Sequence, residues 1–245
     1  MSRSLKTACL AAALLCVGTL AMADGLGLTV GVCAGFGDVL SDISIEVTPY
    51  VEWAHSFGII DFTLHGEYTK SFDAGSGAGS ALVSEDLSLG LGDSVSVTAE
   101  LYNENSYSFE GEGLSGYLEP SVEVGLGVFY ARVGVPFDYL PDTNLAAYGT
   151  VGAAGDAWTV EATVDLGVSG GVSIEDVVLY ADASFSILTL SVAATVPGTF
   201  TFDSVTLSPE VDVYAGALTV AVGADVWLGS GPLSVSPWVD VSFAF

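Results

Sequence analysis

Hydrophobic and polar residues alternate one by one along most of the chain after residue 23. At 45–53 the odd positions are Ile, Val, Pro, Val and Trp, and the even positions are Glu, Thr, Tyr and Glu. Successive side chains of a β-strand point to opposite faces of the sheet. Each alternating stretch is therefore predicted to be a strand with one apolar face and one polar face.

The alternation predicts fourteen strands. They are expected at 26–36, 43–54, 59–70, 86–91, 94–102, 114–126, 128–139, 144–153, 157–168, 177–187, 188–196, 205–215, 218–228 and 233–245. If the short strand 86–91 merges with its neighbour, the count falls to twelve. Tight turns are expected near 55–58, 92–93, 125–127, 154–156, 187–188 and 215–217, and the connections between them are mostly longer and polar. This alternation of turn lengths places both chain ends on the side of the tight turns.

Acidic residues avoid the apolar face of the predicted strands. Half of the thirty acids fall in predicted turns, loops or the terminus. The other half lie on the polar face, together with His65 and Arg132. Such exclusion from the apolar face is expected if that face meets lipid, since a charge near mid-membrane costs about 2–4 kcal/mol for a basic residue and less for an acid. These polar-face acids are Glu46, Glu52, Asp61, Glu67, Glu100, Glu119, Glu123, Asp138, Glu161, Asp165, Asp182, Glu210, Asp212, Asp225 and Asp240.

Two architectures fit a chain of alternating strands, namely a soluble β-sandwich and a membrane β-barrel. The chain is 51% apolar with a mean hydropathy of +0.59, which is high for an acidic protein. Aromatic residues of the apolar face are expected near both strand ends, whereas a sandwich would gather them mid-strand in its core. Two such belts are typical of membrane interfaces and favour the barrel. The belt residues are Trp53, Trp158, Phe185, Phe243 and Phe245 at one end, and Phe36, Tyr68 and Tyr139 at the other.

The first 23 residues are predicted to be a signal peptide. Arg3 and Lys6 precede the apolar run 10–20, which is too short to span a bilayer, and Ala-Met-Ala at 21–23 fits a cleavage site. The expected mature chain, 24–245, keeps two basic and all thirty acidic residues, a formal net charge of −28. Nucleic acid is excluded as a partner for such a chain. Cys33 is its single cysteine, so no intramolecular disulfide is expected.

The last strand carries a resemblance to a known class. From 233 to 245 the odd positions read Leu, Val, Pro, Val, Val, Phe and Phe, and the chain ends on Phe245. This segment resembles the last strand of bacterial outer-membrane β-barrel proteins, the porin-like class. The resemblance implies an all-β fold, a closed antiparallel up-and-down transmembrane β-barrel in outer-membrane lipid. It also implies that Phe245 is the signal read by the barrel-assembly machinery.

A fourteen-stranded barrel is wide enough to contain a channel. Strands about 4.8 Å apart and tilted near 40° close at a backbone radius of roughly 14 Å, which leaves a lumen on the order of 10–15 Å. Small inward residues such as Gly31, Gly125 and Gly223 are expected to keep it open, and the Gly- and Ser-rich loop 71–85 is a candidate plug. Carboxylates on the lumen wall would favour small cations.

Other functions find less support in the sequence. Residues 167–171 match G-x-S-x-G, but they lie in a predicted hairpin loop instead of the strand-to-helix turn that a nucleophile requires. His65 lies among carboxylates, yet no Cys/His metal spacing, calcium loop or nucleotide fingerprint occurs. We therefore expect no enzyme, cofactor or metal site. Two alternatives to a pore stay open: a non-conducting surface barrel with adhesive or structural loops, and a soluble secreted acidic β-protein.

Overall fold

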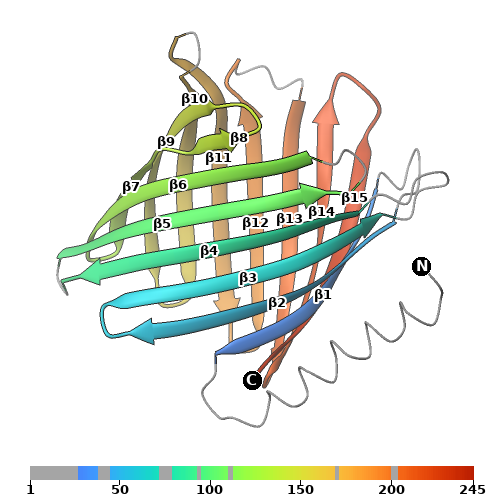
Figure 1. The fold of residues 1–245 in the computed structure, drawn as a ribbon, viewed down its shortest axis with the longest axis horizontal. Helices are drawn as coiled ribbons and strands as arrows, with labels where there is room; N and C mark the ends of the chain where they lie inside the picture. Colours follow the sequence, from blue (N-terminus) through green and yellow to red (C-terminus); the bar gives the residue numbers. More distant parts are fainter. Residues whose placement is uncertain are drawn as a thin grey trace.

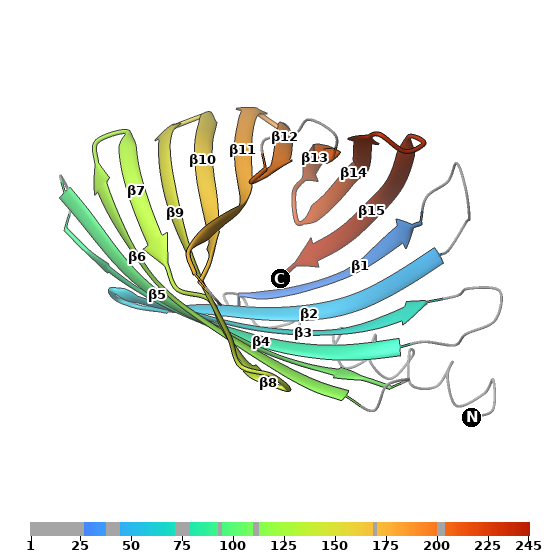
Figure 2. The same ribbon diagram turned by 90° about the horizontal axis from the view of Figure 1, so that it is seen from above.

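The protein is a closed antiparallel β-barrel of fourteen strand positions. A computed structural model describes residues 27–37, 45–71, 79–92, 95–109, 113–168, 171–199 and 204–245. The predicted signal peptide, 1–23, lies outside these residues. Figure 1 shows the tilted strands from the side, and Figure 2 shows them from above. Within the described residues, no helix has the length and apolar character needed to cross a membrane.

Fifteen strand segments form the barrel wall, and apart from β7 and β8 each pairs with its neighbours in chain order. They are β1 (Leu28–Phe36), β2 (Ile45–Phe57), β3 (Ile60–Ser71), β4 (Gly79–Leu91), β5 (Val95–Ser108), β6 (Gly113–Leu126), β7 (Phe129–Gly134), β8 (Phe137–Leu140), β9 (Asn144–Gly155), β10 (Trp158–Gly167), β11 (Ser173–Phe185), β12 (Leu188–Pro197), β13 (Ser204–Ala215), β14 (Leu218–Gly229) and β15 (Ser234–Ala244).

Segments β7 and β8 together occupy one position in the wall. Both pair with β6 on one side and with β9 on the other. The break falls at Val135 and Pro136, and proline has no N–H to donate to a ladder. Two hydrogen bonds still tie the break to its neighbours, from Val135 N to Pro120 O at 3.0 Å and from Ala146 N to Pro136 O at 3.0 Å. The predicted single strand 128–139 is thus interrupted, while the predicted count of fourteen is confirmed.

The first and last strands close the barrel. β1 pairs antiparallel with β15, from Thr29 opposite Ala244 to Gly35 opposite Trp238. Beyond this ladder, Phe245 N donates to Leu28 O at 2.8 Å. The alternative of twelve strands is therefore unnecessary.

Tight turns join the strands at one end of the barrel, close to where the sequence predicts them. Two-residue turns occupy 58–59, 127–128, 156–157, 186–187 and 216–217. Gly58 and Gly216 have φ values of 74° and 68°, a region that favours glycine. Ser186 adopts φ 58° as the one described non-glycine residue with positive φ.

The strand β4 is longer than predicted. It begins at Gly79 instead of residue 86, so residues 79–85 pair with β3 and β5 and belong to the wall. The expectation that the whole loop 71–85 forms a plug is therefore wrong, and residues 72–78 lie outside the described part of the chain. Likewise β5 continues to Ser108, although 103–113 was expected to be a loop. Turn-forming Ser, Gly and Asn obscured the alternation in both stretches.

The outer face of the barrel is apolar and exposed. Val51, Leu87, Val151 and Val222 expose 43%, 45%, 63% and 51% of their surfaces. One acid departs from the predicted rule. Glu85 lies opposite Leu64 of β3 and Asn103 of β5, which places its carboxylate on the outer face. The prediction that no acid lies on the apolar face is thus wrong at this position.

Prolines interrupt the ladders without breaking the wall. The pairing of β2 with β3 skips Pro49 and Thr48, and the pairing of β13 with β14 skips Pro209 and Ser208. Side chains span both gaps, because the Thr48 and Thr69 hydroxyls lie 2.9 Å apart and Ser208 donates to Asp225 at 2.6 Å. Side-chain hydrogen bonds therefore supply part of what the missing proline N–H groups cannot.

Candidate functional site: the inner wall of the barrel

The structure gathers the predicted site residues on the inner face of the wall. This is the face opposite the exposed apolar side chains, and it carries two pockets. Whether these residues line a conducting pore stays a prediction. By strand, they are Glu46 and Glu52 on β2, Asp61, His65 and Glu67 on β3, Glu100 on β5, Glu119 and Glu123 on β6, Arg132 on β7, Glu161 and Asp165 on β10, Asp182 on β11, Glu210 and Asp212 on β13, Asp225 on β14 and Asp240 on β15.

Three further carboxylates join them that were not among the predicted polar-face acids. Asp86 lies opposite Thr63, and Glu104 opposite Tyr117, both in inner-face register. Asp176 lies directly opposite Asp165 on the next strand. The alternation within the predicted strand 86–91 already includes Asp86, and extending the alternation of β5 and β11 toward the long loops would have found the other two. Among the described residues, no group of His, Cys, Asp and Glu has a geometry suited to a metal ion.

Tyrosines are the second component of the inner wall, and the sequence reading missed them. Seven of the ten tyrosines lie on the inner face, and the other three lie outside. Their position could have been read from the same two-residue period, since five of them share a phase with acids of their own strand, Tyr130 with Arg132 and Tyr148 with Thr150. The inner set is Tyr50, Tyr102, Tyr117, Tyr130, Tyr148, Tyr180 and Tyr214.

Aromatic rings cover several inner glycines. A Cβ added at Gly31 would meet the Tyr50 ring at 2.3 Å, and one at Gly152 would meet the Tyr130 ring at 2.5 Å. At Gly223 the Trp238 ring lies 2.4 Å from the Cβ position. The expectation that Gly31 and Gly223 hold the lumen open is therefore wrong. These glycines instead let large rings lie flat against the wall.

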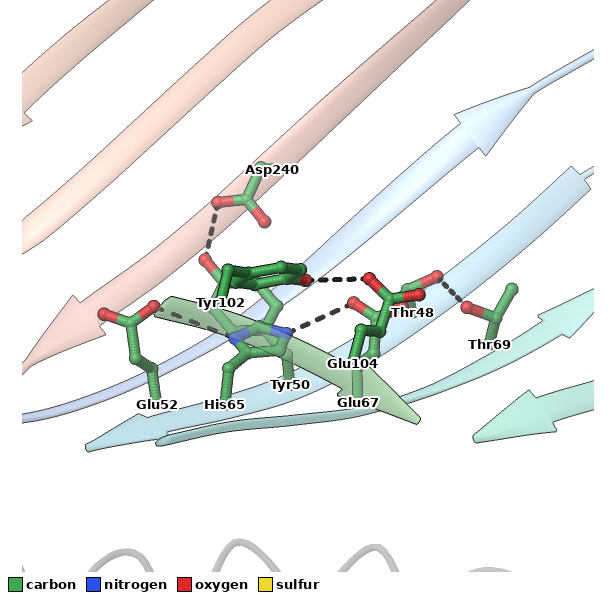
Figure 3. Close-up of polar contacts among 9 residues, drawn as sticks. All are labelled: Thr48, Tyr50, Glu52, His65, Glu67, Thr69, Tyr102, Glu104 and Asp240. Atoms are coloured by element: carbon green, nitrogen blue, oxygen red, sulfur yellow. Dashed lines mark hydrogen bonds and ion pairs between the residues drawn. The ribbon is translucent and has the colours of Figure 1, made fainter. Parts of the chain in front are cut away.

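His65 lies in a group of polar side chains from β2, β3, β5 and β15 (Figure 3). Its Nε2 lies 3.3 Å from Glu67 Oε2 and its Nδ1 lies 3.7 Å from Glu52 Oε2. The imidazole stacks on Tyr50 at a centroid distance of 5.4 Å. Tyr50 in turn donates to Asp240 at 3.0 Å, across the closing seam. This hydrogen bond joins β2 to the last strand, β15, across β1, and so adds a side-chain contact to the backbone pairing of the seam.

Arg132 lies in a second group of polar contacts, on β6, β7 and β9. Its Nη2 and Nε donate to Glu123 Oε2 at 2.9 and 3.2 Å. Nearby, Tyr148 donates to Glu119 at 2.8 Å, and Tyr117 donates to the same carboxylate. These residues adjoin a pocket of about 340 Å³ on the inner face.

Solved structures reveal the class of this fold. Neither family models nor curated proteins match the sequence. The outer membrane protein Omp33 of Acinetobacter baumannii matches with a TM-score of 0.58 at 12% identity, over 91% of this chain and 100% of that one. A triple mutant of the porin of Rhodopseudomonas blastica matches with a TM-score of 0.51 at 12% identity, over 89% and 99% of the two chains.

The chain has the fold of bacterial outer-membrane β-barrel proteins. The porin-like resemblance of its last strand is thus confirmed at the level of the class. Identity this low shows the fold alone, so the chemistry must be argued from the inner wall itself. There, carboxylates partnered by tyrosine hydroxyls present negative charge and aromatic faces toward the interior.

Proposed function

We propose that this protein is an outer-membrane porin-like channel for the passive diffusion of small solutes, with a preference for cations. The observation that supports it most is the imbalance of charge on the inner wall. At least eighteen carboxylates face inward from the strands, while Arg132 is the one Lys or Arg among the inner-face residues described. Such a wall raises the local concentration of cations and repels anions.

The outer surface supports a location in lipid. Large apolar side chains are exposed all around the barrel, which water would penalise and hydrocarbon would not. Export through the signal peptide 1–23 and recognition of Phe245 by the barrel-assembly machinery complete the proposal. The expected partners are outer-membrane lipid, that machinery and small cations or solutes. The same exposed apolar face argues against a soluble secreted protein.

The alternative from another class is a barrel that does not conduct. Seven inner tyrosines and two inner tryptophans, Trp227 and Trp238, occupy space that the sequence reading assigned to an open lumen. A barrel sealed by these side chains would act through its loops, in adhesion or in the structure of the cell surface. Conductance separates the two functions directly.

A planar-bilayer recording in asymmetric salt tests the proposal. Folded protein, identified by its heat-modifiable gel mobility, should open channels. Their reversal potential should be shifted from zero toward the equilibrium potential of the cation. A preference for anions would refute cation selection, and the absence of conductance from folded protein would favour the sealed barrel.

Neutralising inner carboxylates should reduce the preference. A variant with Glu119→Gln, Glu123→Gln, Glu161→Gln and Asp165→Asn removes four charges from one sector of the wall. The matched control removes four acids of the predicted loops and turns, Glu110, Glu112, Asp142 and Asp156. Screening over about 8–10 Å makes distant loop charges weak contributors, so the control should keep most of the selectivity. Equal effects of the two variants would contradict an inner-wall origin.

A further inference from the structure

The outer face of the wall is not chemically uniform around the barrel. On β1 and on β9 to β15, every outward position that the structure describes holds an apolar residue or glycine. Within the described wall, outward charged, amide and imidazole side chains occur on four adjacent strands only, β2 to β5. They are His55, Lys70, Glu85, Asn103 and Asn105. One sector of the outer face therefore differs from the rest.

Three of these residues are neighbours. Glu85 of β4 lies opposite Asn103 of β5, and Asn105 is the next outward residue of β5. From β8, the Tyr139 hydroxyl donates to the Oδ1 atoms of Asn103 at 3.1 Å and of Asn105 at 2.7 Å. Glu85, Asn103 and Asn105 are named here the outer polar patch, on strands that lie side by side in Figure 1.

The outer polar patch lies on the hydrocarbon side of an aromatic cluster. Tyr68 of β3 and Tyr107 of β5 both lie opposite Ala81 of β4. The Phe109 ring contacts both tyrosine rings, at centroid distances of 5.9 and 5.1 Å. Outward tyrosines of this kind mark the level of the lipid headgroups. Glu85 is four residues from Ala81 toward the tight turns, which places it about 10 Å deeper at 3.3 Å per residue and a tilt near 40°.

Polar groups at this depth require partners that lipid does not supply. Hydrocarbon offers no hydrogen bond to a carboxylate or an amide, so such groups in a membrane-spanning wall mark contacts or function. The headgroup level, about 10 Å away, is beyond the reach of a glutamate side chain. A protein surface with polar groups at the same depth would satisfy the outer polar patch.

We propose that the outer polar patch is the contact between two copies of this chain, related by a two-fold axis along the membrane normal. In a two-fold contact one surface meets itself, so it must carry complementary groups. The ionised Glu85 carboxylate only accepts hydrogen bonds. The amides of Asn103 and Asn105 have N–H donors, while their oxygens accept from Tyr139. Glu85 of each copy therefore meets Asn103 of the other.

The rest of the outer face argues against a ring of three or more copies. In a ring, each surface meets a different surface of the next copy. Outside β2 to β5, the described outward positions provide no charged or amide group that could pair with Glu85 or the two asparagines. A two-fold contact needs no second polar surface.

The sector around the patch is large enough for a specific contact. Four strands, β3 to β6, span about 19 Å across, and each runs about 33 Å through an apolar band 25 Å tall. This gives about 600 Å² on each copy and about 1,200 Å² in total, above the roughly 1,000 Å² that specific interfaces need. Outward Gly66 of β3, where nothing lies within 4 Å of an added Cβ, leaves space for a side chain of the other copy.

Cysteine cross-linking in lipid vesicles tests which face meets the second copy. Val83 borders the outer polar patch and is 49% exposed, and Val222, on β14 in the apolar sector, is 51% exposed. In protein freed of Cys9, Cys16 and Cys33 by alanine substitution, a short bismaleimide should join Val83→Cys chains in pairs. Val222→Cys chains should stay mostly single. Equal cross-linking at both positions would indicate random collision and overturn the inference.

Sedimentation equilibrium of the folded protein in detergent micelles measures the dissociation constant of the pair. The triple change Glu85→Leu, Asn103→Leu and Asn105→Leu should raise this constant at least tenfold, because both symmetry-related sets of hydrogen bonds are lost. The barrel itself should keep its heat-modifiable gel mobility, since leucine suits a lipid-facing wall. Glu85→Gln keeps an acceptor and should change the constant less than threefold. His55→Leu, which removes an outward polar group outside the patch, is the control and should leave it unchanged.

The remaining outcomes each contradict the two-fold contact. Chains cross-linked in threes would replace it with a ring. A pair that the triple change leaves intact would place the contact elsewhere on the wall. A single barrel at every concentration would refute the contact, and shielding of the Val83→Cys thiol only in vesicles that contain phosphatidylethanolamine would assign the patch to a lipid headgroup. These measurements do not require current, so the contact can fail while the channel stands, and the reverse.

Discussion

Placing the same charge on adjacent residues of one strand tests which face of the wall meets lipid. Leu87 and Ser88 are consecutive residues of β4. Leu87 is 45% exposed and lies opposite Phe62 and Leu101 on the outer face. Ser88 lies opposite Asp61 and Glu100 on the inner face. We expect Leu87→Arg to destabilise the barrel and Ser88→Arg to be tolerated.

The depth of Leu87 sets the size of the effect. Five residues separate it from Gly92 at the tight-turn end, which corresponds to about 13 Å along the barrel axis at 3.3 Å per residue and a tilt near 40°. The apolar band of such barrels is about 25 Å tall, so residue 87 lies near its middle. An arginine there costs about 2–4 kcal/mol, which lowers the folding equilibrium constant about 30- to 700-fold. An arginine at position 88 faces the interior, so this lipid penalty does not apply to it. An ion pair with one of the two neighbouring carboxylates would contribute up to about 1 kcal/mol.

Denaturant titrations of the folded barrel in lipid vesicles, followed by heat-modifiable gel mobility, measure both free energies of unfolding. The two variants share the chain position, the substituted side chain and the strand, so a difference between them reports the face alone. Equal destabilisation by the two substitutions, or a larger effect at Ser88, would refute the assignment of faces.

Three further predictions follow from the ends, the charges and the packing of the wall. Deleting Phe245 should slow insertion while leaving secretion intact, so that the protein accumulates in the periplasm on cell fractionation; unchanged barrel levels would contradict its role as an assembly signal. Cation preference, read from reversal potentials, should weaken as salt rises and as the pH falls toward about 4, where carboxyl groups gain protons; a preference independent of both would place its origin outside the carboxylates. Gly152→Val should displace the Tyr130 ring and break its hydrogen bond to Glu161, lowering unfolding stability by about 1–3 kcal/mol. Gly149→Ala on the same strand, where no atom lies within 4 Å of the added Cβ, is its control and should cost much less.

Much of the architecture could be predicted because one physical rule governs every strand. Side chains that face lipid must be apolar and the next residue must face inward, so the alternation reveals strands and faces together. The fourteen positions and the tight turns follow from it, whereas the closing of β1 onto β15 was implied by the resemblance of the last strand. Where the apolar–polar alternation is irregular, the predicted strand boundaries were inaccurate. Residues 79–85 carry Gly, Ser and the outward Glu85, and so they resembled a loop.

The inner wall was predictable in its charge but not in its shape. The two-residue period placed Glu119 and Arg132 on one face, yet it contains no information on which inner side chains contact each other. Tyr130 reaches Glu161 only because Gly152 leaves room for the ring, and such a contact depends on register. The two inner-wall pockets adjoin a strand break and two register shifts, which insert or skip single residues. A pattern with a period of two cannot reveal these irregularities.

The four tryptophans divide evenly between the two faces, so tryptophan fluorescence can report on each face of the wall. Trp53 and Trp158 lie on the outer face, whereas Trp227 and Trp238 lie on the inner face. Brominated lipid tails should therefore quench the fluorescence of the outer pair, and water-soluble quenchers that of the inner pair. After replacement of the outer pair by phenylalanine, caesium should quench the remaining emission more strongly than iodide does, because the carboxylates attract one ion and repel the other. The ratio of the two quenching constants would then measure the interior potential optically, without any current across the barrel.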